Sequence, residues 1–208
     1  MARRVISPFH ARLLPLPLIA LLIFLGVPYV VAEPSGPWET LKGCRFLESK
    51  SNDGDSFHVS YRGKEFIFRL YYVDCPETPA HRELTSRTTS QAKYFGIKKT
   101  DLFAISEEAA AFTADVLSRP FSIYTCWEDA RGNSKLPRYF GIVTSSQGDL
   151  AQLLVGRGYA RIYGYAVNPP GEPTGKAFKA TLKADELRAK AEKRGAWAFS
   201  RPSRDPAR

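Results

Sequence analysis

The residues best suited to carry chemistry in this 208-residue sequence form two short acidic segments. An Asp-Gly-Asp segment, 53–55, stands directly before a stretch of alternating apolar residues, and an Asp-Cys-Pro-Glu segment, 74–77, follows the next apolar run. If the two runs pair as a β-hairpin, their far ends meet and the acidic segments become neighbours. Carboxylates of Asp55 and Asp74, completed by backbone carbonyls and waters, are hard ligands suited to calcium. Glu77 then stands at the rim, within reach of a water beside the metal.

Arg69 interrupts the second apolar run, residues 65–73. A guanidinium in such a run is costly unless an opposite charge partners it, so we expect Arg69 to face the carboxylates. Each acidic segment alone has an ordinary explanation, because Asp-Gly-Asp is usually a turn and Asp-x-Pro-Glu usually ends a strand. Paired across a hairpin that also carries an inward arginine, the two segments indicate a functional site.

Hydrophobic periodicity predicts the elements that would position this site. Alternation over 56–61, a polar turn and the run over 65–73 predict the hairpin. A helix is expected from its N-cap at about Ser106 to the residues before Pro120, and a shorter helix follows Asp149. The other expected elements are strands over 121–127, 140–144 and 160–165 and a final helix over 176–194. This order indicates an α+β fold built on a small barrel of about five strands.

The final helix carries an apolar stripe of Phe178, Leu182 and Leu187, and Trp197 beyond it is expected to fold back on the core. Between residues 76 and 100 the chain is polar and rich in serine and threonine. We expect a long excursion from the barrel there, with one short helix.

Residues 1–32 have the composition of a secretory signal peptide. Three arginines precede an apolar stretch, and small residues at its end fit cleavage after Ala32. The prediction is therefore a signal peptide over 1–32, one domain over 33–208, and an exported protein that is secreted or periplasmic. An uncleaved anchor is the alternative, because residues 13–32 could nearly span a bilayer, although three prolines disfavour that helix.

The chain carries a net charge of +9, and loss of the three signal-peptide arginines leaves +6. This moderate excess is compatible with plain solubility and with attraction to a polyanion such as nucleic acid. The cysteines and histidines that remain after cleavage are Cys44, Cys75, Cys126, His58 and His81. Their spacing matches no zinc pattern, so any metal should be a hard cation held by carboxylates.

Several segments, taken together, resemble the staphylococcal nuclease (thermonuclease) family. They are Asp53 to Ser56, Phe68 to Leu70, Val73 to Glu77, Glu108 to Thr113, Lys135 to Arg138, Leu150 to Arg161 and Leu187 to Trp197. The similarity follows essentially all of residues 33–208 in order. It implies an OB-type barrel of five strands with three helices, and the activity of a calcium-dependent nuclease on DNA, RNA or both.

The resemblance also implies metal ligands. Asp55 and Asp74 match the family's calcium carboxylates. Cys75 matches the position whose backbone carbonyl completes the protein ligands, so its thiol is expected to play no part in the chemistry.

The remaining matched side chains imply phosphate handling. Arg69 and Arg138 match the family's two catalytic arginines, whose guanidinium forks stay charged and grip two phosphate oxygens at once. Glu77 matches the glutamate that positions or deprotonates water. Lys135 matches a substrate-binding lysine.

The resemblance leaves the contacts to nucleic-acid bases open. Leu136 stands where the family has an aromatic residue, and Tyr163 and Tyr165 resemble its paired tyrosines with an offset of two residues. The excursion over 79–105 is longer than in the staphylococcal enzyme. Its residues that could supply replacement stacking surface are Lys93, Tyr94 and Phe95. The alternative is a decoration packed on the barrel.

The topology implied by the resemblance pairs the first strand with the strand after the helix at 106–119. Cys44 lies on the former and Cys126 on the latter, which predicts a Cys44–Cys126 disulfide with Cys75 free.

Three hypotheses remain open: an active nuclease, a catalytically weak module that binds nucleic acid or protein, and a structural secreted barrel. The active enzyme is favoured because every role in the site has a residue to fill it. The expected partner is nucleic acid, and the expected state is a monomer without stable membrane association once the signal peptide is removed.

Overall fold

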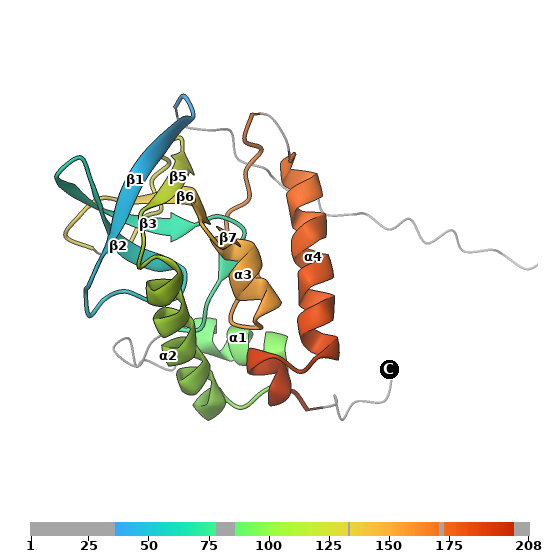
Figure 1. Cartoon of the computed structure of the whole chain (residues 1–208). Helices are drawn as coiled ribbons and strands as arrows, with labels where there is room; N and C mark the ends of the chain where they lie inside the picture. Colours follow the sequence, from blue (N-terminus) through green and yellow to red (C-terminus); the bar gives the residue numbers. More distant parts are fainter. Residues whose placement is uncertain (1–35, 78–85, 133, 171–172, 202–208) are drawn as a thin grey trace, which may run out of the picture. The chain divides into compact units, whose positions relative to one another are not determined.

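The computed structural model describes residues 36–77, 86–132, 134–170 and 173–201 (Figure 1). The predicted signal peptide, 1–32, lies outside these residues. The strands are β1 (Glu39–Leu47), β2 (Ser56–Tyr61), β3 (Lys64–Leu70), β4 (Val73–Asp74), β5 (Phe121–Thr125), β6 (Arg138–Ser145), β7 (Gly148–Asp149) and β8 (Arg161–Ile162). The helices are α1 (Ser86–Phe95), α2 (Lys99–Val116), α3 (Leu150–Gly156), α4 (Gly175–Ala191) and the 3-10 helix η2 (Gly195–Ala198). Within these ranges, no helix is long and apolar enough to cross a membrane.

Five of the described strands close into a ring. Antiparallel pairing joins β3, β2, β1, β5 and β6 in that order, and a parallel pairing between β6 and β3 closes it. β1 serves two neighbours, because residues 39–44 pair with β5 and residues 45–47 pair with β2. Its register shifts at Gly43, whose φ of 76° suits glycine and lets the strand bend. The expected α+β, OB-like fold is confirmed.

Apolar side chains fill one large core that includes the ring and parts of α2, α3 and α4. The strands contribute buried Leu41, Phe57, Val59, Phe68, Leu70, Ile123 and Val143. Alternation along each strand produces this set, since successive side chains point to opposite faces. The helices α3 and α4 pack against it through Leu150, Leu154, Phe178 and Leu182.

The second strand of the predicted hairpin is broken rather than continuous. β3 ends at Leu70, and Tyr72 takes a positive φ of 68° before the chain resumes as β4, which pairs with β8. A non-glycine residue in this conformation is uncommon and here marks a bend. After the bend, the carboxylate of Asp74 lies 3.0 Å from the guanidinium of Arg69.

The described chain contains one α-helix more than the three that the resemblance implied. α1 lies within the excursion, as expected, but α2 begins at Lys99, well before the predicted N-cap. Ser106 lies inside α2, is buried, and donates its hydroxyl to the Phe103 carbonyl at 2.7 Å. Leu102 and Ile105 explain the early start, because both are fully buried against other parts of the fold.

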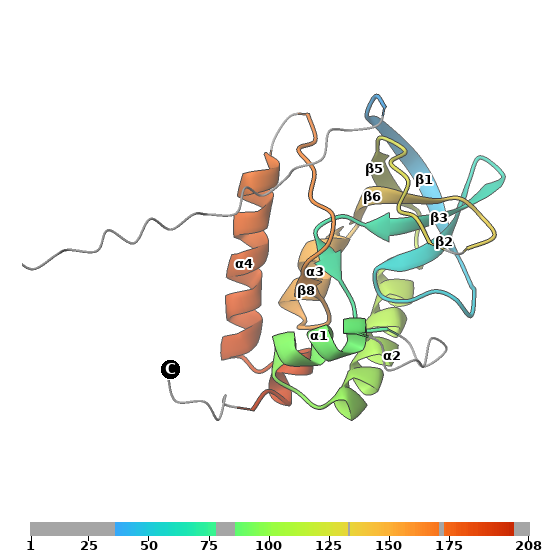
Figure 2. The same cartoon turned by 180° about the vertical axis from the view of Figure 1, so that it is seen from behind.

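A second apolar cluster holds the excursion against the C-terminal helices. Its members are Ala92, Phe95, Ile97, Leu102, Ile105, Ala189, Ala196 and Trp197. Figure 2 shows α1 beside α2 and the red η2 segment. Trp197 folds back as predicted, but against Phe95, with ring centroids 4.9 Å apart. The predicted stripe of α4 was wrong at Leu187, which is 65% exposed, whereas Ala189 is buried.

The predicted Cys44–Cys126 disulfide was wrong: the described structure has no disulfide between these residues, and the three described cysteines are all buried. Cys44 lies opposite Phe121, at one end of the β1–β5 ladder. Cys126 follows Thr125, which pairs with Glu39 at the other end. Antiparallel pairing therefore separates the two thiols by roughly 15 Å along the ladder, far beyond disulfide reach.

Candidate active site

The first acidic segment is a tight turn fixed by its own hydrogen bonds. The Asp53 carboxylate accepts the backbone N–H groups of Asp55 at 3.0 Å and Ser56 at 2.6 Å. Gly54 is required in this turn, because a Cβ there would lie 2.7 Å from the Cys75 sulfur. The turn therefore fixes the backbone of Asp55 against the second acidic segment.

Arg69 joins the two acidic segments, as the sequence predicted. Its position in β3 is opposite Ser56 of β2, at the end of the hairpin. One guanidinium nitrogen donates to Asp55 Oδ2 and to Asp74 Oδ1, both at 3.0 Å. These carboxylates, Asp55 first, raise the pKa of Arg69 above its ordinary value. The charge that interrupts the apolar run is thus paired and fixed.

Asp74 is the most heavily contacted side chain of the site. Its Oδ1 accepts from Arg69 and forms an ion pair with Arg87, while its Oδ2 accepts from Gln91 at 2.9 Å and Arg161 at 2.7 Å. Burial alone would raise the pKa of Asp74, but Arg87, then Gln91 and the other two guanidinium groups hold it below its ordinary range. The carboxylate is therefore ionised throughout the physiological pH range.

Glu77 stands at the rim, with its side chain 15% exposed and paired with Arg87. Cys75, two residues earlier, is buried, and its carbonyl accepts from Gln91 at 2.8 Å. A carbonyl oxygen has two lone pairs, so one remains for another ligand. Burial, followed by the nearby aspartates, raises the pKa of the Cys75 thiol well above its ordinary value, which is unfavourable to thiolate chemistry.

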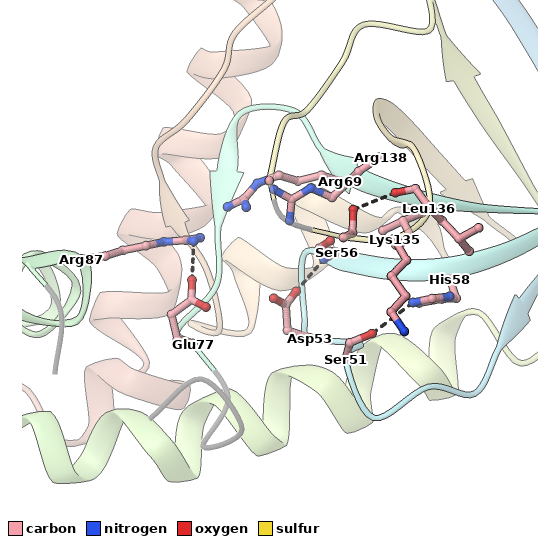
Figure 3. A pocket seen from close by; sticks show the side chains of 13 residues that line it. Ser51, Asp53, Ser56, His58, Arg69, Glu77, Arg87, Lys135, Leu136 and Arg138 are labelled. Carbon is pink, nitrogen blue, oxygen red and sulfur yellow. Dashed lines mark hydrogen bonds and ion pairs between the residues drawn. The ribbon is translucent and has the colours of Figure 1, made fainter. Parts of the chain in front are cut away.

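A cleft of about 790 Å³ opens over these residues (Figure 3). Arg69, Glu77, Arg87 and Arg138 line one part of it, and Lys135 lines another. The structure therefore brings the predicted arginines, glutamate and lysine to a single cavity. Such a cluster of cations beside carboxylates is suited to an anionic ligand held next to a metal or a base.

Arg138 reaches the cleft from β6, whose parallel pairing places it opposite Ile67 in β3. Its Nε donates to the Arg131 carbonyl at 2.7 Å, and it forms no ion pair with any residue in the described ranges. The guanidinium lies across Gly132, where a Cβ would come within 2.3 Å of it. Arg138 is thus oriented by the preceding loop, and its charge is left for a ligand.

The outer part of the cleft is lined by Lys135, Leu136 and His58. Lys135 is exposed and Leu136 offers an aliphatic surface where the family has an aromatic ring. His58 is held between Glu65, 2.5 Å from its Nδ1, and Ser51, 3.1 Å from its Nε2. His58 was not assigned a role from the sequence; its strand position, facing the same side as Ser56, is the signal that places it here.

The two tyrosines and the excursion differ in what they can offer a base. Tyr165 is stacked on Phe140, with ring centroids 5.0 Å apart, and so belongs to the core packing. Tyr163 is 58% exposed and lies under the guanidinium of Arg161 at 4.1 Å. Phe95 is fully buried, which excludes it as a stacking surface and favours the packed-decoration interpretation of the excursion.

The donors fit a calcium ion in one decisive respect. Asp55 Oδ1 is fully buried and accepts no hydrogen bond from any residue that the structure describes. A buried carboxylate oxygen without a partner is costly unless a cation or water completes it. Asp53 differs, because its carboxylate accepts two backbone N–H groups. Burial and then the neighbouring Asp55 raise the pKa of Asp53 well above its ordinary value, so a nearby cation would favour its ionised form. Across the described residues no three histidine, cysteine or acidic side chains converge, so a calcium ion at this place would need main-chain oxygens and waters as its other ligands.

Three site residues were not recognised from the sequence: Arg87 and Gln91 of α1, and Arg161 of β8. Arg87 and Gln91 are four residues apart on one helix, which places them on one face. Arg161 falls within a matched segment, but nothing in its neighbours identifies its partner. Their recognition needed the position of α1 against the ring, which depends on contacts distant in sequence.

The fold and the site together define a class: an OB-like ring of strands whose rim carries an acid–arginine cluster in an open cleft. The family model for staphylococcal nuclease homologues matches residues 67–199, which include Arg69, Glu77, Arg138 and most of the described helices. The chain therefore belongs to the staphylococcal nuclease homologue family.

Proposed function

We propose that this protein is an exported, calcium-dependent nuclease that hydrolyses phosphodiester bonds of DNA, RNA or both. The observation that carries the proposal is the convergence of Arg69, Arg138 and Glu77 on one cleft beside Asp55 and Asp74. Membership of a nuclease family supports the same reaction.

Arg69 and Arg138 would bind the phosphate that is cleaved. Hydrolysis adds negative charge to the phosphate oxygens in the transition state, and guanidinium groups fixed in advance stabilise that charge. Arg69 is fixed by Asp55 and Asp74, and Arg138 by the Arg131 carbonyl. Both groups are therefore oriented before substrate arrives.

Glu77 would accept the proton of the attacking water or orient that water. Its place at the rim of the cleft, facing the same space as the arginines, supports this role (Figure 3). The ion pair with Arg87 holds the carboxylate in place and occupies its Oε1.

Asp55 and Asp74 would hold calcium, with the remaining lone pair of the Cys75 carbonyl as a further oxygen ligand. Bound there, calcium would neutralise a phosphate oxygen and draw water and substrate together. The unpartnered Asp55 Oδ1 is the feature of this chain that supports a cation at this place.

The deciding experiment is digestion of fluorescent DNA and RNA oligonucleotides by purified, folded protein with calcium and then with chelator. We expect cleavage with calcium and loss of cleavage with chelator. Activity that survives chelation contradicts the calcium assignment. A folded protein that binds the oligonucleotides but leaves them intact in calcium would identify a binding module instead.

A further inference from the structure

Arg87 is a third arginine in the cleft, and the proposed reaction assigns it no role. It is the second residue of α1 and pairs with Asp74 Oδ1 and with Glu77 Oε1. Its side chain is 35% exposed, compared with 16% for Arg69 and 3% for Arg161. Among the described arginines that contact Asp74, Arg87 is therefore the one most accessible to a ligand entering the cleft.

The helix that carries Arg87 is firmly anchored. Gln91 and Phe95, on its next turns, are both fully buried. Gln91 donates to Asp74 Oδ2 and to the Cys75 carbonyl, and Phe95 packs against Trp197. A change in the contacts of Arg87 can thus occur by side-chain rotation alone, while α1 stays in place.

Asp74 does not depend on Arg87 for its charge balance. Without that contact it would still accept from Arg69, Gln91 and Arg161. Glu77 differs, because Arg87 is the one cation that pairs with it among the described residues. Release of Arg87 would therefore leave Asp74 satisfied and make Glu77 available in the same step.

We propose that Arg87 is a third phosphate-binding arginine, which exchanges Glu77 and Asp74 for a phosphate oxygen of the incoming nucleic acid. This inference rests on the proposed nuclease function. A phosphodiester offers two charged oxygens on one group, so both guanidinium nitrogens that now contact two separate carboxylates keep charge-assisted hydrogen bonds after the exchange. Substrate binding would thereby free the glutamate that acts on water, which couples binding to the chemical step.

A second consequence concerns metal affinity. Arg87 contacts Asp74 Oδ1, one of the two carboxylate oxygens through which this residue would hold calcium. The positive charges of the guanidinium and of the ion would repel each other. Removal of the arginine charge should therefore strengthen calcium binding, whether or not nucleic acid is present.

The test compares Arg87→Ala with Lys183→Ala, which removes one positive charge from an exposed position of α4. For Arg87→Ala we expect KM for a single-stranded oligonucleotide to rise about 10- to 100-fold, while kcat stays within about threefold. The slope of log K against log salt for oligonucleotide binding should fall by about 0.7, the value for one lost phosphate contact. Calcium binding, measured by calorimetry, should tighten about tenfold.

Arg87→Lys keeps the charge but loses the fork, so its KM should lie between those of the wild type and Arg87→Ala. The Arg87→Lys variant also tests the proposal if the Arg87→Ala variant does not fold. A KM and salt slope equal to those of Lys183→Ala would overturn the phosphate role, and unchanged calcium affinity would overturn the competition at Asp74. If the wild type itself does not cleave, the nuclease proposal fails, whereas the binding slope and the calorimetry still decide the role of Arg87.

Discussion

Glu77 and Arg138 have different contacts in the site, and these contacts suit different proposed roles. Glu77 faces the cleft and, among the described residues, pairs only with Arg87, whose side chain is 35% exposed. This environment suits the role in activating water that we propose for it. Arg138 is oriented by a backbone carbonyl and makes no ion pair within the described ranges. Its positive charge is therefore available to bind an anionic ligand.

Replacement of Glu77 by glutamine should slow the reaction without weakening binding. The amide keeps the size of the side chain but cannot accept the water's proton, so kcat should fall by about 100-fold or more, with KM nearly unchanged. Steady-state kinetics on an oligonucleotide checks this. Glu107→Gln, on the exposed face of α2, is the matched control and should leave kcat unchanged. Equal kcat values for the two variants would remove Glu77 from the chemistry.

Gly132→Ala should displace Arg138 while leaving the fold intact. The new Cβ would come within 2.3 Å of the guanidinium, whose flexible side chain would have to move. We expect kcat/KM to fall about tenfold or more, because small displacements of positioning groups are costly. Gly148→Ala is the matched control, since it has the same φ of +120° and nothing within 4 Å of its Cβ. If both variants lose activity equally, backbone strain rather than Arg138 is responsible.

At the scale of elements, a helix or strand could be predicted where its boundaries depend on neighbouring residues, and not where they depend on contacts distant in the sequence. The hairpin did: alternation and a turn of positive-φ residues, Arg62 and Gly63, brought Asp55, Arg69 and Asp74 together as expected. The start of α2 did not, because Ser106 has the residue type of an N-cap while the burial of Leu102 and Ile105 extends the helix past it.

The same distinction explains the missed parts of the site. The local sequence predicts that Arg87 and Gln91 are exposed polar residues of a surface helix, and that Leu187 belongs to a buried apolar stripe. Which side of α1 or α4 is covered depends on the second apolar cluster, whose members come from four separate elements. Hydrophobic periodicity finds a helix reliably but cannot rank two faces of similar polarity.

Asp149, the N-cap of α3, should make stability depend on pH. Its carboxylate accepts the Gln152 N–H at 3.0 Å, and burial raises its pKa to about 6. Because the folded state holds the proton more tightly than the unfolded state, the contribution is greatest below about pH 4 and is lost as pH rises through about 6. Relative to Asp149→Asn, which keeps a cap acceptor, the wild type should lose about 2 kcal/mol between these limits, after allowance for partial exposure.

Urea denaturation of both proteins at several pH values measures that difference. A difference in unfolding free energy that stays constant across the range would contradict the raised pKa. Asp115→Asn, at an exposed position of α2, is a suitable control.

At the scale of the whole molecule, the three thiols are all inside a protein that the sequence expects to be exported. Burial raises the pKa of Cys44 to about 11, and Cys75 is shifted in the same direction. Both effects slow reaction with alkylating reagents and oxidants. The described domain thus obtains its stability from two apolar clusters rather than from a covalent link.

Mass spectrometry after alkylation tests this. We expect almost no modification of the native protein within minutes and three modified cysteines after unfolding without reductant. A mass lower by two hydrogens, with only one thiol that reacts, would instead support the Cys44–Cys126 disulfide that the structure contradicts. The mass of the exported protein should also correspond to a chain that begins at Glu33, because the signal-peptide prediction places cleavage after Ala32.

Asp74 accepts from donors on β3, α1 and β8, so one carboxylate ties together segments that are far apart in the sequence. Loss of Asp74 would leave the guanidinium groups of Arg69, Arg87 and Arg161 close together without the carboxylate that they share. Their repulsion would destabilise the fold as well as the proposed metal site. Glu77 has no such structural burden. We therefore expect that a variant changed at Glu77 would lose the proposed catalysis but keep its fold, whereas a variant changed at Asp74 would fold poorly.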